Sequence, residues 1–457
     1  MKKVCLLVLS FLFCMNETNS QINPDYAARL QVVLDSMCNK YSIKGASAAI
    51  IVPGKGIWTG VHGLSYAGVP INSGMAFPLN SNTKTYIAAL MLKLQEDGAL
   101  QLSDTIGTWI HNKTNINGQI TIRQLLNHTS GLYSYTDSAA FSDSLNADYS
   151  RIWQPYEMLS FIGPPLFAPG TSWSYSNTNY LLAGMIISQV CGMPIEQAVR
   201  SKLFNPQGLS QTWYYPQERP TAVIPHFWFY DGVGVTDGLV YGYTPEAFYS
   251  AASSAGAIFS TASDNALFWQ KLSSGQIINS TSMAQWRQMV TLNSNIGYGL
   301  GVFRYRNFNG HVIYEHGGTG AGAINENLVD SATGVCISLL TNQDSADNNI
   351  LLNQVIRVLH KVTLNAPTEV YAGNYAPSIK WYPNPAQDEL HISFRQNLTS
   401  MVHYSIADMS GREILTRNLL PADVQTISIE TLKNGYYVLN IISDGNILVS
   451  DRFIVWK

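Results

Sequence analysis

Two kinds of hydrophobic pattern alternate along the first 365 residues. Residues 45–52 are almost continuously apolar, which predicts a buried strand, and residues 56–63 follow as its hairpin partner. Further strands are predicted near the end of this region, over residues 297–306, 311–316, 324–330 and 335–341. Helical periodicities fill the interval from about residue 85 to residue 290. This order predicts an α+β fold, in which a mainly antiparallel sheet is flanked by helices and joined to a helical subdomain.

Helices are predicted where apolar residues recur at spacings of three and four. One such helix opens at Ser81 and stops at Gly98, and its apolar face contains Ile87, Leu90, Met91 and Leu94. A second helix is predicted over residues 179–190. A third lies near residue 355, and its apolar side carries Ile350, Leu351, Val355, Ile356 and Leu359.

The pattern changes near residue 366, where Ala366-Pro367 and Ala376-Pro377 interrupt it. We therefore place a linker over residues 366–378. From Leu390 onward apolar residues alternate with period two, and turn pairs such as Asn434-Gly435 separate the runs. Residues 379–457 are thus predicted to form a small all-β sandwich.

The first 20 residues have the composition of a secretory signal peptide. Lys2 and Lys3 precede a short apolar core, and small residues lie before the expected cleavage site at Gln21. The apolar core is too short for a membrane anchor, which needs about 20 residues. A lipoprotein signal through Cys14 is the alternative, although Phe13 is bulky for the position before a lipidated cysteine. No later stretch could span a bilayer. The mature large domain is placed at residues 21–365, between the signal peptide and the linker.

Charge and cysteine content exclude several function classes. The chain has 27 Lys and Arg against 30 Asp and Glu, for a net charge of −3, and its longest basic run is Lys2-Lys3. A nucleic-acid footprint is therefore not expected. The mature chain keeps Cys38, Cys191 and Cys336, which suit buried free thiols and have no metal-ligand spacing. We expect neither a metal nor another cofactor.

Ser81 and Lys84 lie at the start of the predicted 81–97 helix. A spacing of three puts the hydroxyl and the amine on one face, one turn apart. Serine becomes a nucleophile when a base takes its proton. Burial and the positive helix N-terminus would both favour the neutral amine that such a base requires. Taken alone, the S-x-x-K pair is a weak signal, because chance matches are common, and a capping serine beside a surface lysine is then the favoured interpretation.

Two later segments strengthen the catalytic interpretation. Tyr175 and Asn177 precede a predicted helix, and in an extended segment their side chains would point the same way, where a tyrosine could relay a proton. His316 ends a predicted strand and is followed by Gly317, Gly318 and Thr319, and paired glycines let a ligand approach the backbone. Individually these residues also fit a packed tyrosine and a structural strand-end histidine.

In the order S-x-x-K, Y-x-N and H-x-G, the chain resembles the serine β-lactamase and penicillin-binding-protein superfamily. The similarity is to its branch of class C β-lactamases, D-alanyl-D-alanine carboxypeptidases and esterases. It extends over about residues 25–362 and includes "QLLNHTSGLYSY", "APGTSWSYSNTNYLLAG", "EHGGTGAG" and "VCISLLTNQ". His128, in the first of these segments, is interpreted as structural.

The resemblance implies a role for each matching residue. Ser81 would be the acylated nucleophile, Lys84 its base and Tyr175 a general acid and base. Four further positions would contact the substrate or hold it in place: Asn177, His316, Gly318 and Thr319. The backbone N–H groups of Ser81 and Thr319 would form the oxyanion hole.

His316 departs from the β-lactamases, which often carry lysine at this position. Because the usual pKa of histidine is about 6.5, the ring would be mostly neutral at pH 7 and would bind a substrate carboxylate only when protonated in mild acid. The resemblance therefore implies a D-alanyl peptide carboxypeptidase or esterase with weak or no β-lactamase activity.

The segment from about residue 380 to residue 457 resembles a type A sorting domain of type IX secretion substrates. The resemblance rests on "YPNPAQDEL", "SGRE" and "LKNGYYVLNI". It implies a type IX secretion machinery as partner, and export through the periplasm and outer membrane to the cell surface or beyond. A carbohydrate-binding or spacer domain is the alternative for this sandwich.

Two other functions remain open. The large domain could be a non-catalytic module of the penicillin-binding fold that serves as a binding or scaffold protein, or the β-tail could be the active part of an adhesin. The sequence leaves the acyl and leaving groups of the substrate and the oligomeric state undetermined.

Overall fold

The computed structural model describes residues 22–111, 113–344, 348–365, 380–383, 385–393, 402–408, 412–419, 424–443 and 446–457. The predicted signal peptide (1–20) and linker (366–378) lie outside these residues. The chain divides into two compact units, Met1–Leu364 and Asn365–Lys457. Each unit has its own hydrophobic core.

The larger unit is built on one sheet whose neighbouring strands are all antiparallel, in the order β3-β2-β1-β15-β14-β12-β11-β10-β9, with β13 paired to β14. The strands are β1 (Gly45–Val52), β2 (Gly56–Tyr66), β3 (Val69–Pro70), β9 (Val290–Thr291), β10 (Ile296–Tyr298), β11 (Phe303–Phe308), β12 (His311–Glu315), β13 (Gly318–Gly320), β14 (Ala323–Asp330) and β15 (Cys336–Thr341). The first strand thus pairs with one of the last, from Ala46 opposite Thr341 to Ile51 opposite Cys336. The predicted α+β class with a mainly antiparallel sheet is confirmed.

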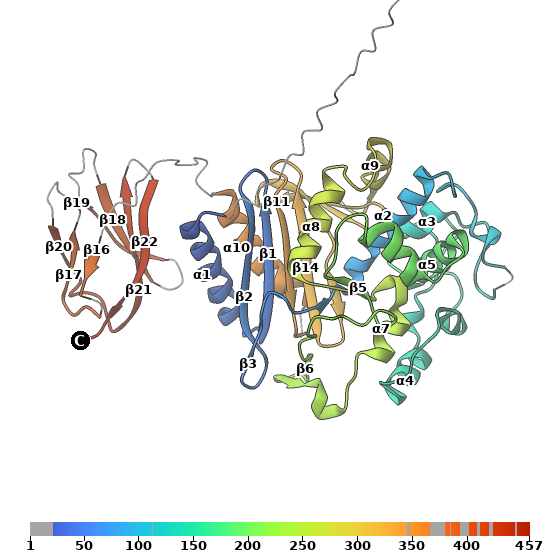
Figure 1. The fold of residues 1–457 in the computed structure, drawn as a ribbon, viewed down its shortest axis with the longest axis horizontal. Coiled ribbons are helices and arrows are strands. Elements are labelled where there is room, and N and C mark those ends of the chain that lie inside the picture. The colour runs from blue at the N-terminus through green and yellow to red at the C-terminus, as the bar shows by residue number, and fades with distance from the viewer. Residues whose placement is uncertain are drawn as a thin grey trace, which may run out of the picture. The chain divides into compact units, whose positions relative to one another are not determined.

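Helices cover both faces of this sheet (Figure 1). On one face lie α1 (Pro24–Lys40) and α10 (Asn348–Leu364), which pack against each other. The other face is covered by α8 (Ala262–Ser273), which contacts β1, β14 and β15. The catalytic candidates lie on the α8 side, where the sheet meets the helical region.

The helical region fills the interval between β3 and β9. Its α-helices are α2 (Thr83–Glu96), α3 (Ile122–Leu126), α4 (Ala139–Ala147), α5 (Asn177–Cys191), α6 (Ile195–Val199), α7 (Glu246–Ala252) and α9 (Ser280–Trp286), beside α8. Short strands form a small sheet in the order β4-β8-β5 and a separate pair, β6 and β7. Their bounds are β4 (Phe77–Pro78), β5 (Thr212–Tyr214), β6 (Trp228–Tyr230), β7 (Val235–Asp237) and β8 (Ile258–Ser260). The predicted helical subdomain is therefore present.

Two predicted elements differ in detail. The strand expected over 297–306 is two strands, β10 and β11, because the chain turns sharply between them at Gly301, which has a φ of +68°. A Cβ at Gly301 would also lie 2.7 Å from the carbonyl oxygen of Lys84, so this turn packs directly on α2. The helix expected to open at Ser81 begins instead as a 3₁₀ turn, η1 (Asn80–Asn82), which leads into α2 at Thr83.

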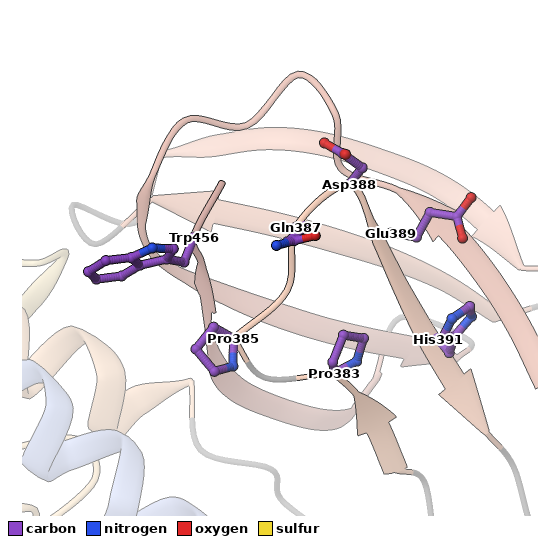
Figure 2. Close-up of a pocket in the computed structure, with 7 residues that line it drawn as sticks. All are labelled: Pro383, Pro385, Gln387, Asp388, Glu389, His391 and Trp456. Atoms are coloured by element: carbon purple, nitrogen blue, oxygen red, sulfur yellow. The ribbon is translucent and has the colours of Figure 1, made fainter.

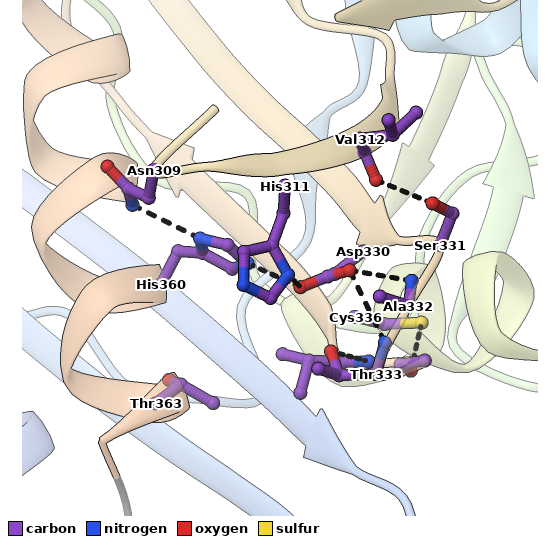
Figure 3. A network of polar contacts seen from close by, with 12 residues as sticks. Asn309, His311, Val312, Asp330, Ser331, Ala332, Thr333, Cys336, His360 and Thr363 are labelled. Carbon is purple, nitrogen blue, oxygen red and sulfur yellow. Dashed lines mark hydrogen bonds and ion pairs between the residues drawn. The ribbon is translucent and has the colours of Figure 1, made fainter. Parts of the chain in front are cut away.

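A buried carboxylate ties α10 to the sheet (Figure 3). Asp330 on β14 lies 3.1 Å from Nε2 of His360 on α10 and 2.7 Å from Nδ1 of His311 on β12. Burial alone would raise the pKa of Asp330, but the hydrogen bonds from His360 and the Ala332 N–H lower it to about 2. The ionised carboxylate therefore joins three elements of the fold.

The smaller unit is a two-sheet β-sandwich. One sheet has the order β16-β17-β20 and the other β19-β18-β21-β22, with a shared apolar core. The strands are β16 (Lys380–Tyr382), β17 (Glu389–Ser393), β18 (Val402–Asp408), β19 (Glu413–Leu419), β20 (Val424–Ser428), β21 (Gly435–Ser443) and β22 (Asn446–Val455). This confirms the predicted all-β sandwich, although β16 and β19 were not anticipated.

The two ends of the sandwich are joined by backbone hydrogen bonds. The Ala386 N–H donates to the Ile454 carbonyl (2.7 Å), and the Trp456 N–H donates to the Ala386 carbonyl (2.9 Å). Around this junction Figure 2 shows a groove lined by Pro383, Pro385, Gln387, Asp388, Glu389, His391 and Trp456. The motif residues at the start and end of the sandwich thus share one surface.

Within the described residues, no single helix has the length and hydrophobicity needed to cross a membrane, although the bent pair Asn177–Cys191 and Ile195–Phe204 meets both criteria together. Cys38, Cys191 and Cys336 are free thiols. Cys38 and Cys336 are buried as expected, whereas Cys191 is half-buried.

Candidate active site

Ser81 is held at the junction of η1 and the sheet. The preceding Asn80 has a φ of +47°, and its side-chain amide donates to the Ala323 carbonyl at 3.1 Å. The following Thr83 accepts a hydrogen bond from the Ile258 N–H at 3.1 Å. Contacts on both sides of Ser81 therefore fix the backbone, while the Ser81 side chain stays half-buried and accessible.

Lys84 is the most unusual residue of the site because its side chain is completely buried. Its Nζ lies 3.0 Å from Ser81 Oγ and donates to the Ala255 carbonyl at 2.8 Å. The ring centroids of Tyr175 and Tyr180 lie 4.9 and 5.8 Å away. Burial lowers the pKa of Lys84 well below its usual value. The Lys84 amine is therefore suited to accept a proton from Ser81.

Tyr175 completes this group, since its ring centroid lies 4.9 Å from Lys84 Nζ. Burial raises the pKa of the Tyr175 phenol, and the nearby Ser81 hydroxyl opposes this effect without cancelling it. The resting side chain is therefore a neutral phenol. The Lys84 amine and the Tyr175 phenol are therefore both near the Ser81 hydroxyl, so Lys84 can serve as the base while Tyr175 supplies or relays a proton.

The His128 segment holds Tyr175 in place. His128 is buried, and its Nδ1 accepts hydrogen bonds from the Ser176 N–H (3.2 Å) and the Asn179 side-chain amide (2.9 Å). The His128 carbonyl accepts the Ser174 N–H at 3.1 Å. These bonds lie on both sides of Tyr175, and the His128 ring lies 4.3 Å from the ring of Tyr175. The structural interpretation of His128 fits this geometry.

Asn177 is placed differently from Tyr175. It is the first residue of α5, so the extended segment in which both side chains would point the same way ends at Ser176. The Asn177 side-chain amide donates to Thr136 Oγ1 at 3.0 Å, and its backbone N–H donates to Ser134 Oγ at 3.1 Å. Asn177 remains half-buried beside the site, and its contact with substrate stays a prediction.

His316 lies directly after β12 and is only 2% exposed. Its Nδ1 lies 2.7 Å from the Gly317 carbonyl, which can only accept, so Nδ1 carries the proton. Nε2 lies 3.2 Å from the Tyr298 hydroxyl and can accept its proton. Burial, with a smaller contribution from Lys84, lowers the pKa of His316 to about 3. The expectation of a cationic His316 in mild acid is therefore wrong, because the surrounding sheet removes water from the ring.

The strand β13 continues the register of β12 along β14 and packs against η1. Gly318 is buried there, and a Cβ on it would contact the Leu79 carbonyl and lie 2.7 Å from Asn80 Cβ. Only glycine lets the β13 backbone approach η1 so closely. Thr319, the next residue, is exposed, and its backbone is brought beside the segment that carries Ser81.

Several contributors to this site carry no local sequence signal. The Ala255 carbonyl binds Lys84, and any residue could supply such an oxygen. Tyr180 and Tyr298 lie behind the site, where Tyr180 donates to the Leu126 carbonyl at 2.7 Å. Among 25 tyrosines, only the three-dimensional contacts identify them. Within the described ranges, no group of three His, Cys, Asp or Glu side chains is arranged to bind a metal.

Comparisons with known proteins identify a family for each of the two domains. A family model described as Beta-lactamase matches residues 26–361, and one described as Secretion system C-terminal sorting domain matches residues 380–456. A putative penicillin-binding protein PbpX from Bacillus subtilis is 30% identical over 234 residues, which are 50% of this chain and 53% of PbpX. The esterase EstB from Burkholderia gladioli is 28% identical over 232 residues, which are 47% of this chain and 58% of EstB.

A solved structure provides the third comparison. A D-stereospecific amidohydrolase from Streptomyces sp. is 29% identical, with a TM-score of 0.64, and the match covers 73% of this chain and 98% of that enzyme. The chain spans about half the length of the curated relatives it matches. The β-lactamase model alone covers more than half of the chain. This chain therefore belongs to the β-lactamase family of serine hydrolases, and a secretion-system sorting domain follows its β-lactamase domain.

Proposed function

We propose that this protein is a secreted serine hydrolase that cleaves an amide or ester through an acyl-enzyme on Ser81. The observation that carries the proposal is the 3.0 Å contact between Ser81 Oγ and the Nζ of a fully buried Lys84. Burial lowers the pKa of this amine and so favours its neutral form, and a neutral amine at hydrogen-bond distance can take the hydroxyl proton.

The proposed reaction has two balanced halves. Ser81 Oγ bonds to the substrate carbonyl carbon as its proton passes to Lys84, and the carbonyl oxygen becomes an oxyanion. When the oxyanion collapses, the bond to the amine or alkoxide breaks, and Lys84 returns the proton to the leaving group through Tyr175. Water then attacks the acyl carbon and gives its proton to the same two groups. The bond between the acyl carbon and Ser81 Oγ breaks, the proton returns to Ser81 Oγ, and the acid is released.

We assign the oxyanion hole to the backbone N–H groups of Ser81 and Thr319. The close packing of β13 on η1 supports this assignment, because it brings the two backbones to the same place. A donor of this kind typically contributes about 3–4 kcal/mol to transition-state stabilisation. Gly318 and Asn177 would then border the bound substrate, Gly318 by leaving space and Asn177 by binding an amide.

His316 narrows the substrate class. Because its ring is neutral and buried, it offers no positive charge to a substrate carboxylate at neutral pH. We therefore favour substrates whose leaving group carries no carboxylate, such as D-amino acid amides and simple esters, over D-alanyl-D-alanine peptides and β-lactams. The D-stereospecific amidohydrolase and the esterase among its relatives support this preference.

The sorting domain indicates type IX secretion to the cell surface or extracellular space. We propose that a signal peptide over residues 1–20 first takes the chain to the periplasm. The sandwich over residues 379–457 would then be recognised for passage across the outer membrane.

A fluorophosphonate probe tests the chemistry directly. We expect stoichiometric labelling of the purified protein, mapped by mass spectrometry to Ser81, and its loss in Ser81→Ala. Ser144→Ala, which changes a serine on α4 that is half-buried like Ser81, is the matched control and should label fully. Turnover should then be compared for D- and L-amino acid amides, p-nitrophenyl esters, D-alanyl-D-alanine peptides and nitrocefin. Absence of labelling and of all turnover would favour the non-catalytic scaffold, and labelling of another serine would overturn the assignment.

A further inference from the structure

A strained turn lies directly behind the Ser81–Lys84 pair. It runs from Ser253 to Gly256, between α7 and β8. Ser253 has a φ of +46° and a ψ of −134°, a backbone region that glycine enters freely and that serine occupies only at an energetic cost. Ser253 is also buried, so the surrounding structure must hold it in this conformation.

Hydrogen bonds to two other elements, together with local backbone bonds, hold this turn. Ser253 Oγ lies 3.0 Å from the Tyr214 hydroxyl on β5. The Ser253 carbonyl accepts the N–H groups of Gly256 (3.0 Å) and Ala257 (2.8 Å). The neighbouring Ser254 hydroxyl donates to the Tyr180 carbonyl on α5 at 2.7 Å. Side-chain hydrogen bonds to β5 and α5 therefore stabilise a backbone conformation that glycine would adopt without strain.

The turn and the first residue of β8 present polar groups to the start of α2. The Ala255 carbonyl accepts a hydrogen bond from Lys84 Nζ at 2.8 Å, and the Ile258 N–H donates to Thr83 Oγ1 at 3.1 Å. Two consecutive residues of α2 are thus held by one short segment. Since Lys84 Nζ is also 3.0 Å from Ser81 Oγ, the position of the Ala255 carbonyl determines how the amine faces the nucleophile.

A carbonyl is a chemically suitable anchor for a base of this kind. It accepts one N–H of the neutral amine, which leaves the nitrogen lone pair free to face the Ser81 hydroxyl. A carboxylate in the same place would stabilise the ammonium form and raise the pKa of Lys84. The titratable groups near the amine are Tyr175 and Tyr180, whose rings face it, and His128 and His316, whose pKa values it helps to lower.

We propose that Ser253 is a positioning residue for the catalytic base. Its hydrogen bond to Tyr214 holds the turn in the strained conformation that directs the Ala255 carbonyl at Lys84. This inference rests on the proposed role of Lys84 as the base. It accounts for a serine at a position where glycine would be free of strain, because glycine has no hydroxyl to bind Tyr214.

The variant Ser253→Gly separates positioning from simple structural support. Glycine relieves the backbone strain, so the thermal midpoint should change by less than about 4 °C. Acylation by a p-nitrophenyl ester should nevertheless slow at least tenfold, because the loosened carbonyl no longer fixes the amine. The acidic limb of the acylation rate should also move to higher pH, since a less confined Lys84 is better solvated and its pKa rises.

Two further variants and a control complete the test. Tyr214→Phe should slow acylation in the same way, and adding it to Ser253→Gly should cause little further loss, because both remove one interaction. Ser260→Ala is the matched control, since Ser260 forms a similar buried hydroxyl pair with Thr212 at 2.8 Å on the same small sheet. It should leave the rate and the acidic limb unchanged.

The inference is overturned if Ser253→Gly acylates within threefold of the wild type with an unmoved acidic limb, or if Ser260→Ala shows the same losses. This outcome differs from failure of the proposed function, in which the wild type would take no fluorophosphonate label or Ser81→Ala would keep it, whatever Ser253 does.

Discussion

Gly318→Ala should damage catalysis far more than stability, because it acts on the gap between β13 and η1. An added Cβ would lie 2.6 Å from Asn325 Nδ2 and 2.7 Å from Asn80 Cβ, where ordinary contacts begin at 3.4 Å. It would also contact the Leu79 carbonyl, which is backbone and cannot rotate away. The backbone of β13 would therefore have to move by about 0.8 Å or more, which is the difference between an ordinary contact of 3.4 Å and the 2.6 Å separation from Asn325 Nδ2.

This displacement sets the expected size of the effect. A misplacement of about 1 Å typically costs about 100-fold in rate, and loss of one oxyanion donor about 100- to 1,000-fold. We therefore expect kcat to fall by about 100-fold or more, with KM less affected. The overpacking itself should cost about 1–3 kcal/mol of stability.

Steady-state hydrolysis of a p-nitrophenyl ester and a thermal melt of the same preparation measure both quantities. Gly234→Ala is the matched control, since a Cβ there meets nothing within 4 Å and Gly234 has no positive φ. A Gly318→Ala enzyme that stays folded with kcat within threefold of the wild type would refute the argument that the β13 backbone forms the oxyanion hole.

Four further predictions follow from other contacts. Lys84→Gln should reduce acylation, measured by stopped flow, about as far as Ser81→Ala, because nucleophile and base act as one unit. Since burial lowers the pKa of His316 to about 3, the KM for carboxylate-bearing substrates should not change with a midpoint near pH 6 when the pH is lowered from 8 to 5. A midpoint near pH 6 would contradict the neutral ring. Asp330 has a pKa of about 2 in the folded protein, below its usual 3.8, so it contributes about 2 kcal/mol to the free energy of unfolding above pH 3.8, and this contribution is lost as the pH falls towards 2. Chemical denaturation at pH 7 should show that Asp330→Asn has lost the same amount. Mass spectrometry of the secreted protein should find an N-terminus near Gln21 and a C-terminus within about 365–382, and an intact Lys457 would instead favour a retained accessory domain.

The sequence predicted those parts of the fold that local pattern determines. The continuous apolar run at 45–52 became β1, and the periodic apolar face after Ser81 became α2. Ser81 and Lys84 could be paired in advance because their spacing is imposed by one turn of helix. The break between β10 and β11 was missed, because the packing of Gly301 on α2 brings together segments more than 200 residues apart.

The environment of the site residues was less accessible to sequence reasoning. The pKa of His316 depends on its burial and on Lys84, and its tautomer depends on the Gly317 carbonyl and on Tyr298. Of these, the sequence around His316 reveals only Gly317. The anchor of Lys84 is a main-chain carbonyl at Ala255, which has no residue preference. Side-chain identity could therefore suggest the reacting groups, whereas their protonation states required the three-dimensional structure.

The pairing of β1 with β15 has a consequence for how this domain is made. These strands are separated by almost 300 residues, yet they lie side by side at the centre of the sheet. Such distant contacts are slow to form, because the intervening chain must first be brought together. Ser81 belongs to the early part of the chain, whereas His316 and β13 belong to the late part. The proposed active site therefore needs both parts of the chain, and a chain that stops before β15 would lack a strand that pairs with β1 and β14.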